Sequence, residues 1–312
     1  MVKKLISFVA AGALVLMFGS ALGAQQVGDA EFKFENEEPT YEPGQGPLVL
    51  VDEAHSNFHT ISGRFQTFAQ VGVGDGYRVE PSAAPITKEL LEHCRVFVIS
   101  NARSNGTSPS AFADDEIGAL KEWVESGGSL LLIADHMPFS GYAIQLAKAF
   151  DIQFTNGFAF ELGDAPNGEW STTGAQPTVF ARDTGTLGNH PITNGVDPSD
   201  RIDSMRTFTG QAFQAEAPIQ PLMVFSPEFV SLMPQVAWEF SDDTPRVSVD
   251  GWYQGAALEY GRGRAAFFGE AAMFTAQVSG PNRVPMGMNS PMAEQNPQFV
   301  LNVLGWLSGV LN

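Results

Sequence analysis

The apolar residues of this chain gather into short uninterrupted runs instead of alternating with polar ones. The clearest run is Leu130 to Ala134, which follows the pair Gly127-Gly128 and ends at Asp135-His136. A short apolar run between turn residues is typical of a strand buried on both faces of a parallel sheet. We therefore predict a central strand here, with Asp135 and His136 at its carboxyl end.

Similar runs alternate with segments of helical periodicity. Strands are expected at 48–52, 77–80, 96–100, 130–135, 256–260 and 265–269, and one more strand region at 151–160. Helices are expected at 60–70, 86–94, 114–126 and 142–150, and a last one with Asn296 as its cap. This alternation predicts a doubly wound α/β fold, in which a mostly parallel sheet carries helices on both faces.

The order of these segments also suggests domain boundaries. Residues 1–23 have two lysines before an apolar stretch and small residues near Gly23, a pattern typical of a secretory signal peptide. A retained membrane anchor is the alternative, because the stretch is nearly long enough to span a bilayer. Residues 24–46 form an acidic spacer, 47–312 one domain, and 161–250 a long insertion of loops and β-hairpins.

The negative net charge of the chain limits the kinds of partner that it is expected to bind. The 312 residues carry a net charge of −18, and removal of the leader leaves 15 basic against 35 acidic residues, a net charge of −20. Such a surface repels nucleic acid and anionic membranes. We expect a soluble exported protein, periplasmic or secreted, with a small molecule or glycan as its partner and no membrane contact after leader cleavage. The single cysteine, Cys94, allows no intramolecular disulfide.

Ionisable residues follow three of the predicted strands. They are Asp52, Glu53 and His55 with nearby His59, then Asp135 with His136, and then Glu270. The carboxyl ends of parallel strands meet at one edge of a sheet, where ligands of such folds bind. Asp135, His136, Glu270 and Glu53 are the candidate catalytic residues.

A metal is the second possibility at this edge. His55 and His59 are four residues apart, which would place both on one face of a helix, and Asp52 adds a carboxylate. This set predicts a divalent metal such as zinc. Simpler roles are open too, because Asp52 and Asp135 suit helix caps and His59 suits a solvated helix position.

Four stretches resemble the class I glutamine-amidotransferase-like superfamily, especially ThuA-like and related flavodoxin-like domains. They are Leu48 to His55, Asp114 to His136, Tyr260-Gly261-Arg262-Gly263-Arg264, and the closing helix with Asn302 and Trp306-Leu307. The resemblance implies a flavodoxin-like three-layer sandwich. Amidotransferases of the superfamily place a cysteine nucleophile where this chain has Asp135 or His136, so thioester chemistry is not expected. ThuA-like proteins have Gly-His where this chain has Gly269-Glu270.

Two functions are consistent with these residues. The first is a hydrolase, not a glutaminase, that acts on a small polar compound through Asp, His and Glu side chains, either with a metal or by general acid–base catalysis. By resemblance, the substrate would be sugar-like. The second is a non-catalytic domain that binds a small molecule, a glycan or a protein partner on the same fold.

Overall fold

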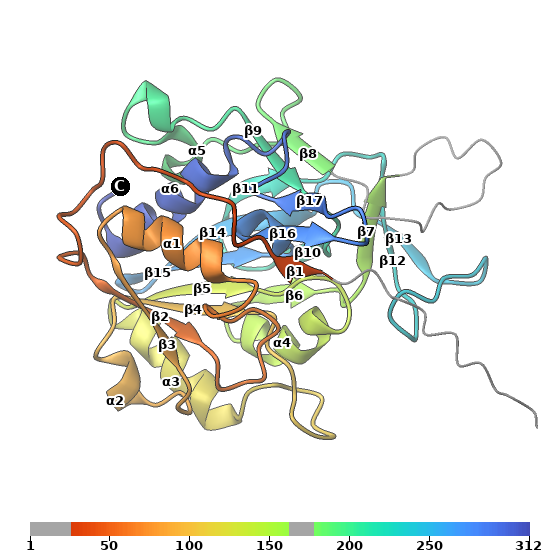
Figure 1. Cartoon of the computed structure of the whole chain (residues 1–312). Helices are drawn as coiled ribbons and strands as arrows, with labels where there is room; N and C mark the ends of the chain where they lie inside the picture. Colours follow the sequence, from red (N-terminus) through yellow and green to blue (C-terminus); the bar gives the residue numbers. More distant parts are fainter. Residues whose placement is uncertain (1–25, 162–177) are drawn as a thin grey trace, which may run out of the picture.

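The computed structural model describes residues 26–161 and 178–312, so the expected leader at 1–23 lies outside the described residues. Among the described residues, no helix is both long enough and apolar enough to cross a membrane. Figure 1 shows a central sheet with helices on either side of it.

Five of the six helices of the described residues cover the expected regions, with shifted ends, and the short helix at 191–194 was not expected. The helices are α1 (Gln66–Gly74), α2 (Lys88–Leu91), α3 (Asp114–Glu125), α4 (Phe139–Lys148), α5 (Pro191–Asn194) and α6 (Asn296–Ser308), with the 3-10 turns η1 (Pro198–Asp200) and η2 (Ala272–Phe274). The first helix begins six residues later than expected and continues beyond residue 70, so that it includes two glycines. Gly72 is one of them: a Cβ there would lie 3.0 Å from Val79 and 3.4 Å from Leu304. The glycine therefore lets α1 approach its neighbours closely.

The main sheet has nine strands in the order β3-β2-β4-β5-β15-β14-β10-β6, with β11 also paired to β14. Their bounds are β2 (Leu48–Asp52), β3 (Arg78–Ser82), β4 (Val96–Ser100), β5 (Ser129–Ile133), β6 (Ile152–Phe154), β10 (Phe213–Ala215), β11 (Gln220–Val224), β14 (Tyr253–Tyr260) and β15 (Gly263–Phe268). Predicted strands 48–52 and 130–135 thus belong to one sheet. The α/β fold class is confirmed.

The sheet is mixed, however, and the expectation of a mostly parallel sheet holds only for one half. Strands β3, β2, β4, β5 and β15 run parallel. From β15 onward the neighbours β14, β10, β11 and β6 pair antiparallel. Numbered along the chain, the five parallel strands have the order 2-1-3-4-5, which is also that of flavodoxin-like sheets.

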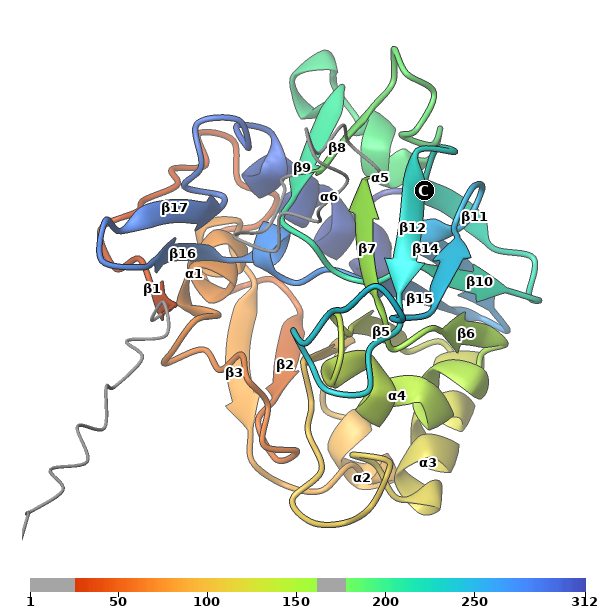
Figure 2. The ribbon, with the colours of Figure 1, turned by 90° about the vertical axis from the view of Figure 1, so that its right-hand side faces the viewer.

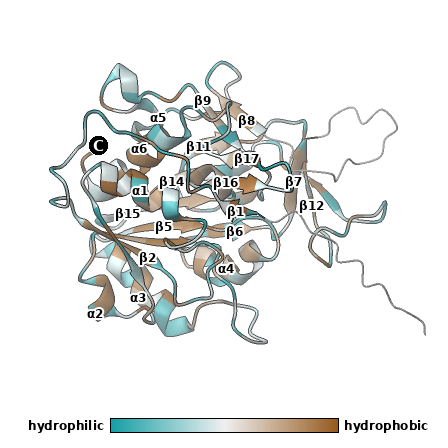
Figure 3. Cartoon of the chain, in the orientation of Figure 1, coloured by the Kyte–Doolittle hydropathy of each residue, from teal (hydrophilic) through white to brown (hydrophobic). Residues whose placement is uncertain are grey.

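Alternate residues of the parallel strands enter two different cores. Val51, Val98 and Ile133 pack with α1 and α6 in one cluster. Leu50, Ile99 and Leu132 pack with α2, α3 and α4 in the other. Both faces of each strand are therefore apolar, which explains the uninterrupted runs in the sequence. Figure 3 shows these strands as hydrophobic, beside loops that are more hydrophilic.

The segment expected as an insertion of loops and β-hairpins, residues 161–250, contributes β10 and β11 to the main sheet. These strands cover the edge of the long strand β14, whose unpaired backbone would otherwise be exposed. The segment also forms the pair β8 (Thr178–Ala181) and β9 (Ser204–Thr207), and the strands β12 (Phe229–Leu232) and β13 (Arg246–Ser248). Strand β12 pairs with β7 (Phe158–Glu161). Figure 2 shows β7 and β12 side by side. The expected strand region 151–160 is split between β6 and β7.

The described part of the acidic spacer is attached to the domain. Strand β1 (Val27–Gly28) pairs with β16 (Ala276–Ser279), which also pairs with β17 (Val284–Gly287). Further along, the Asp75 carboxylate accepts hydrogen bonds from the Thr40 N–H at 2.7 Å and the Asn36 side chain at 2.9 Å. The spacer thus lies against the fold at two separate points.

Substitution of Gly263 tests the close approach of α3 to β15. A Cβ at residue 263 would collide with the carbonyl oxygens of Val124 and Gly128. Gly263→Ala is expected to lower the free energy of unfolding by about 1–3 kcal/mol, the usual cost of overpacking. Gly106→Ala is the matched control, because nothing lies within 4 Å of its added Cβ. Equal chemical-denaturation midpoints for the two variants would contradict this packing.

Candidate functional site

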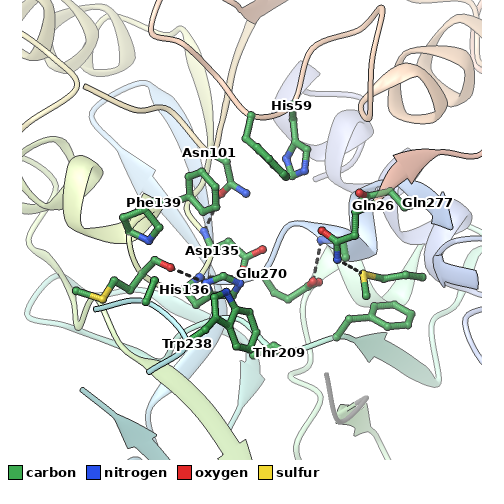
Figure 4. Close-up of a pocket in the computed structure, with 17 residues that line it drawn as sticks. Gln26, His59, Asn101, Asp135, His136, Phe139, Thr209, Trp238, Glu270 and Gln277 are labelled. Carbon is green, nitrogen blue, oxygen red and sulfur yellow. Dashed lines mark hydrogen bonds and ion pairs between the residues drawn. The ribbon is translucent and has the colours of Figure 1, made fainter. Parts of the chain in front are cut away.

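Three of the predicted catalytic residues line one cavity of about 280 Å³. They are Asp135 and His136, which follow β5, and Glu270, which follows β15. Figure 4 shows them together with several other wall residues. The wall is otherwise formed by Gln26, Phe58, His59, Asn101, Met137, Pro138, Phe139, Phe208, Thr209, Ala237, Trp238, Ala272, Gln277 and Met286.

Sheet register brings the two carboxyl groups to the same edge. Ile133 of β5 pairs with Phe268 of β15, and Asp135 and Glu270 each lie two residues further on. The backbone N–H of Asp135 donates to Asn101 Oδ1 at 2.9 Å. The side-chain Oδ1 of Asp135 accepts from the backbone N–H of His136 at 2.7 Å. These bonds fix Asp135 at the cavity wall, where its side chain is 14% exposed.

The His136 ring is oriented by its neighbours. Its Nδ1 lies 2.7 Å from the Met137 carbonyl oxygen, which can only accept a hydrogen bond, so Nδ1 carries a proton. In the neutral ring, Nε2 is therefore an acceptor, and it lies 3.8 Å from Asp135 Oδ1. The His136 ring stacks on the Phe158 ring, with 4.5 Å between the ring centroids. It also lies edge-on to the Trp238 ring, with 4.7 Å between the centroids.

Glu270 is the most buried ionisable group of the site, with 1% of its surface exposed. Its carboxylate caps η2, since Oε1 accepts from the Ala272 N–H at 2.7 Å and Oε2 from the Met273 N–H at 2.8 Å. Burial, together with the charge of Asp135, nevertheless raises the pKa of Glu270 to about 8. The site therefore favours a protonated Glu270 at neutral pH.

His59 also lines the cavity but differs from its expected role as a solvated helix residue or a metal ligand. It is buried before the start of α1, and its Nδ1 lies 2.8 Å from Ser100 Oγ. Burial and the charge of Arg64 lower the pKa of His59 to about 3. The ring is thus a neutral part of the wall.

The Asp52 and His55 pair lies outside this cavity and has a structural role. His55 Nδ1 lies 2.9 Å from both oxygens of Asp52, and its Nε2 lies 3.1 Å from Glu116 Oε1 on α3. Burial alone would lower the pKa of His55, but the hydrogen bonds and charges of the two carboxylates outweigh it and raise that pKa. The imidazolium ties the end of β2 to the first turn of α3.

These contacts do not fit the predicted zinc site. Both ring nitrogens of His55 face carboxylates, while a metal requires a free nitrogen lone pair. Within 26–161 and 178–312, no group of three or more His, Cys, Asp or Glu side chains is arranged to hold a metal ion. Glu53, the fourth predicted catalytic residue, is also elsewhere: its carboxylate accepts from the Ile61 N–H at 2.8 Å. Asp52, His55, His59 and Glu53 are therefore not assembled into a metal or catalytic set.

Several wall residues were not identified from the sequence. Asn101 directly follows β4 and has a positive φ of 49°. Trp238 and Thr209 also have positive φ values, in segments without regular structure. Gln277 reaches the cavity from β16. A polar residue directly after a buried strand could have indicated Asn101, but no periodicity marks the other three.

No family model matches the chain, and no curated protein sequence matches it. Among solved structures, it is similar to the mmIFT52 N-terminal domain, with a TM-score of 0.57 and 13% identity over 84% of this chain and 97% of that one. At this identity, the similarity shows the fold alone.

Two ThuA-like proteins are also similar in structure. One, from Bacteroides uniformis, has a TM-score of 0.46 and 14% identity over 88% of this chain and 94% of the other. The second, from Parabacteroides merdae, has a TM-score of 0.43 and 10% identity over 86% and 91% of the two chains.

The His55 ion pairs predict a pH-dependent stability. Since the folded-state pKa is raised, the stabilisation is fully present below the unfolded-state value near 6.5 and is lost as the pH rises through the folded-state value. His55→Gln is expected to lower the free energy of unfolding by about 1.5–3 kcal/mol at pH 5–6, with a smaller loss at pH 9. Urea denaturation between pH 5 and pH 9 measures this loss of unfolding free energy. The control is His93→Gln, because His93 is exposed. A loss independent of pH would contradict the ion-pair interpretation.

Cys94 is predicted to be dispensable. It lies between α2 and β4, its Sγ contacts the Leu91 carbonyl, and burial raises the pKa of its thiol to about 12. A thiol with so high a pKa contains little reactive thiolate. Cys94→Ser should leave any activity unchanged, and iodoacetamide should alkylate the native protein slowly. Loss of activity upon alkylation of Cys94 would overturn this prediction.

Proposed function

We propose that this chain is an exported hydrolase of small polar compounds, in which Glu270 is the general acid and Asp135 activates the attacking water. One observation carries the proposal. The carboxyl groups of Asp135 and Glu270 follow adjacent strands and line one cavity. Burial of Glu270, together with the charge of Asp135, raises the pKa of Glu270. Paired carboxyls whose pKa values are driven apart suit acid and base roles.

The proposed reaction uses only groups of the chain and water. Glu270 donates its proton to the leaving-group oxygen as the bond between that oxygen and the substrate carbon breaks. A water molecule adds to the same carbon, and Asp135 takes the proton that the water loses. His136 Nε2 supports this step as a second acceptor near Asp135 Oδ1. Exchange with solvent then returns the proton from Asp135 to Glu270.

The wider assignment is part of the same proposal. The 2-1-3-4-5 order of the parallel strands supports a flavodoxin-like domain of the class I glutamine-amidotransferase-like superfamily. The position of Asp135 at the end of β5 supports the expectation that thioester chemistry is absent. The apolar segment before Gly23 supports export to the periplasm or beyond.

A non-catalytic binding domain is the second candidate, and two hydrogen bonds favour it. Both oxygens of Glu270 accept backbone N–H groups of η2, so a carboxylate at this position has a structural use without catalysis. In that case the cavity would bind a small molecule or glycan without turnover.

The hydrolase is tested with Glu270→Gln and Asp135→Asn on a panel of methyl glycosides, because their alkoxide leaving group needs the proton of a general acid; release of the free sugar is measured. Each variant is expected to lose about 10²–10⁴-fold in kcat, the usual contribution of general acid–base catalysis. In the unsubstituted protein, kcat/KM should fall as the pH rises through about 8, because Glu270 then loses its proton. The matched control is Glu239→Gln, because Glu239 is exposed, follows Trp238 in the chain and is not among the lining residues.

Full turnover by both variants would rule out these roles. Binding of a glycoside without turnover by the unsubstituted protein would favour the binding domain.

A further inference from the structure

Three polar side chains of the cavity wall have hydrogen-bonding capacity that no residue within 26–161 or 178–312 uses. From their arrangement we infer that Asn101, Thr209 and Gln277 form the specificity subsite for a hydroxyl-bearing ligand without net charge. The inference rests on the cavity of the proposed function and adds the chemical class that it selects.

Asn101 supplies a donor. The residue is 1% exposed, and its Oδ1 is already occupied by the Asp135 N–H at 2.9 Å. Its Nδ2 has no partner among the described residues, while the side chain lines the cavity. Figure 4 shows the amide beside the space between Asp135 and His59. Because Oδ1 is fixed by the backbone, the amide nitrogen is the atom left for a ligand.

Gln277 supplies an acceptor. It is 2% exposed, and its Nε2 donates to Thr275 Oγ1 at 2.8 Å. Its Oε1 is buried without a partner among the residues that the structure describes. A buried acceptor without a donor is unfavourable, and such groups often have a functional explanation.

Thr209 can both donate and accept. Its Oγ1 is likewise buried without a partner within the described part of the chain. The residue has a φ of 140°, which is uncommon for a β-branched residue, and its carbonyl oxygen accepts from Gln254 Nε2 at 2.7 Å. Strained backbone of this kind often occurs at ligand-binding positions.

The charges of the wall restrict the ligand further. No lysine or arginine is among the lining residues, and the carboxylate of Asp135 would repel an anion. The guanidinium of Arg64 is close by but is bound to the Gln26 carbonyl and stacked over Phe58. An ammonium ion could only donate, so it would leave the Asn101 donor unmatched. Hydroxyl groups, which both donate and accept, match the hydrogen-bonding capacity of all three side chains.

Size and shape are consistent with a single polar ring. The cavity volume of about 280 Å³ lies at the lower end for small-molecule sites. Trp238, which is 46% exposed, provides an apolar face at the rim. A hexose has polar edges for the three side chains and an apolar face for such a ring.

Binding of matched hexoses tests the charge selection. Glucose and galactose are compared with their 2-amino and uronate forms at pH 7 by ligand-observed NMR on the full mature chain. A neutral hexose is expected to bind at least about tenfold more tightly than its charged forms, which corresponds to about 1.4 kcal/mol. Equal or tighter binding of the amino or uronate form, or no binding of either neutral hexose at millimolar concentrations, would overturn the inference.

Thr209→Val tests the subsite without changing side-chain shape or β-branching. It should weaken hexose binding about tenfold. The melting temperature should stay the same or rise, because an unpaired buried hydroxyl is removed. Thr209→Ser keeps the hydroxyl and should bind as the unsubstituted protein does. Gln277→Leu should weaken binding similarly.

Unchanged affinity in both Thr209→Val and Gln277→Leu would refute the subsite, even if Glu270-dependent hydrolysis were observed. Conversely, hexose binding that needs these side chains but supports no Glu270-dependent turnover would refute the hydrolase and leave the subsite in place.

Discussion

The parallel pairing of β5 with β15 is the constraint on which the candidate site depends. It joins residues 129–133 to residues 264–268, so the site exists only when distant parts of the chain have come together. Their register sets Asp135 beside Glu270, and β4 adds Asn101 on the other side of β5. Because all three strands are buried on both faces, a slip in register would expose or displace an entire apolar row. The packing of the core therefore also fixes the positions of the polar groups at its edge.

Two acidic environments next to this edge have opposite effects on their ionisable partners. At the end of β2, Asp52 and Glu116 surround His55 and stabilise its positive charge. At the ends of β5 and β15, Glu270 is buried beside Asp135 with no cation among the lining residues, so burial first, and then the charge of Asp135, disfavour the charged form of Glu270. The first arrangement stabilises the connection between a strand and a helix. The second favours the protonated form of Glu270 in the cavity.

The sequence was informative where burial controls the pattern. The runs at 48–52, 96–100 and 130–135 predicted buried strands because both faces of each strand are covered by helices. The antiparallel half was harder to predict, since β10 and β11 are short and depend on the edge of β14 rather than on a pattern of their own.

The candidate site was predictable only in part, for a related reason. Residues directly after strands, such as Asp135 and Glu270, were found by position. Asp52 and His55 have the same kind of position, and only their contacts with each other and with Glu116 show a structural role. Thr209 and Trp238 lie in irregular segments, where backbone conformation is set by tertiary contacts that leave no periodic signal.

The pair of strands β7 and β12 has a consequence for how this protein could diversify. Phe158 of β7 stacks on His136 and packs against Trp238, so the rim of the cavity belongs to a small sheet separate from the one that holds the carboxyl groups. Substitutions or length changes in the segment that carries Trp238 would alter what enters the cavity without disturbing β5 or β15. The carboxyl groups and this part of the rim are thus held by different sheets, so the rim can change while the carboxyl groups keep their positions.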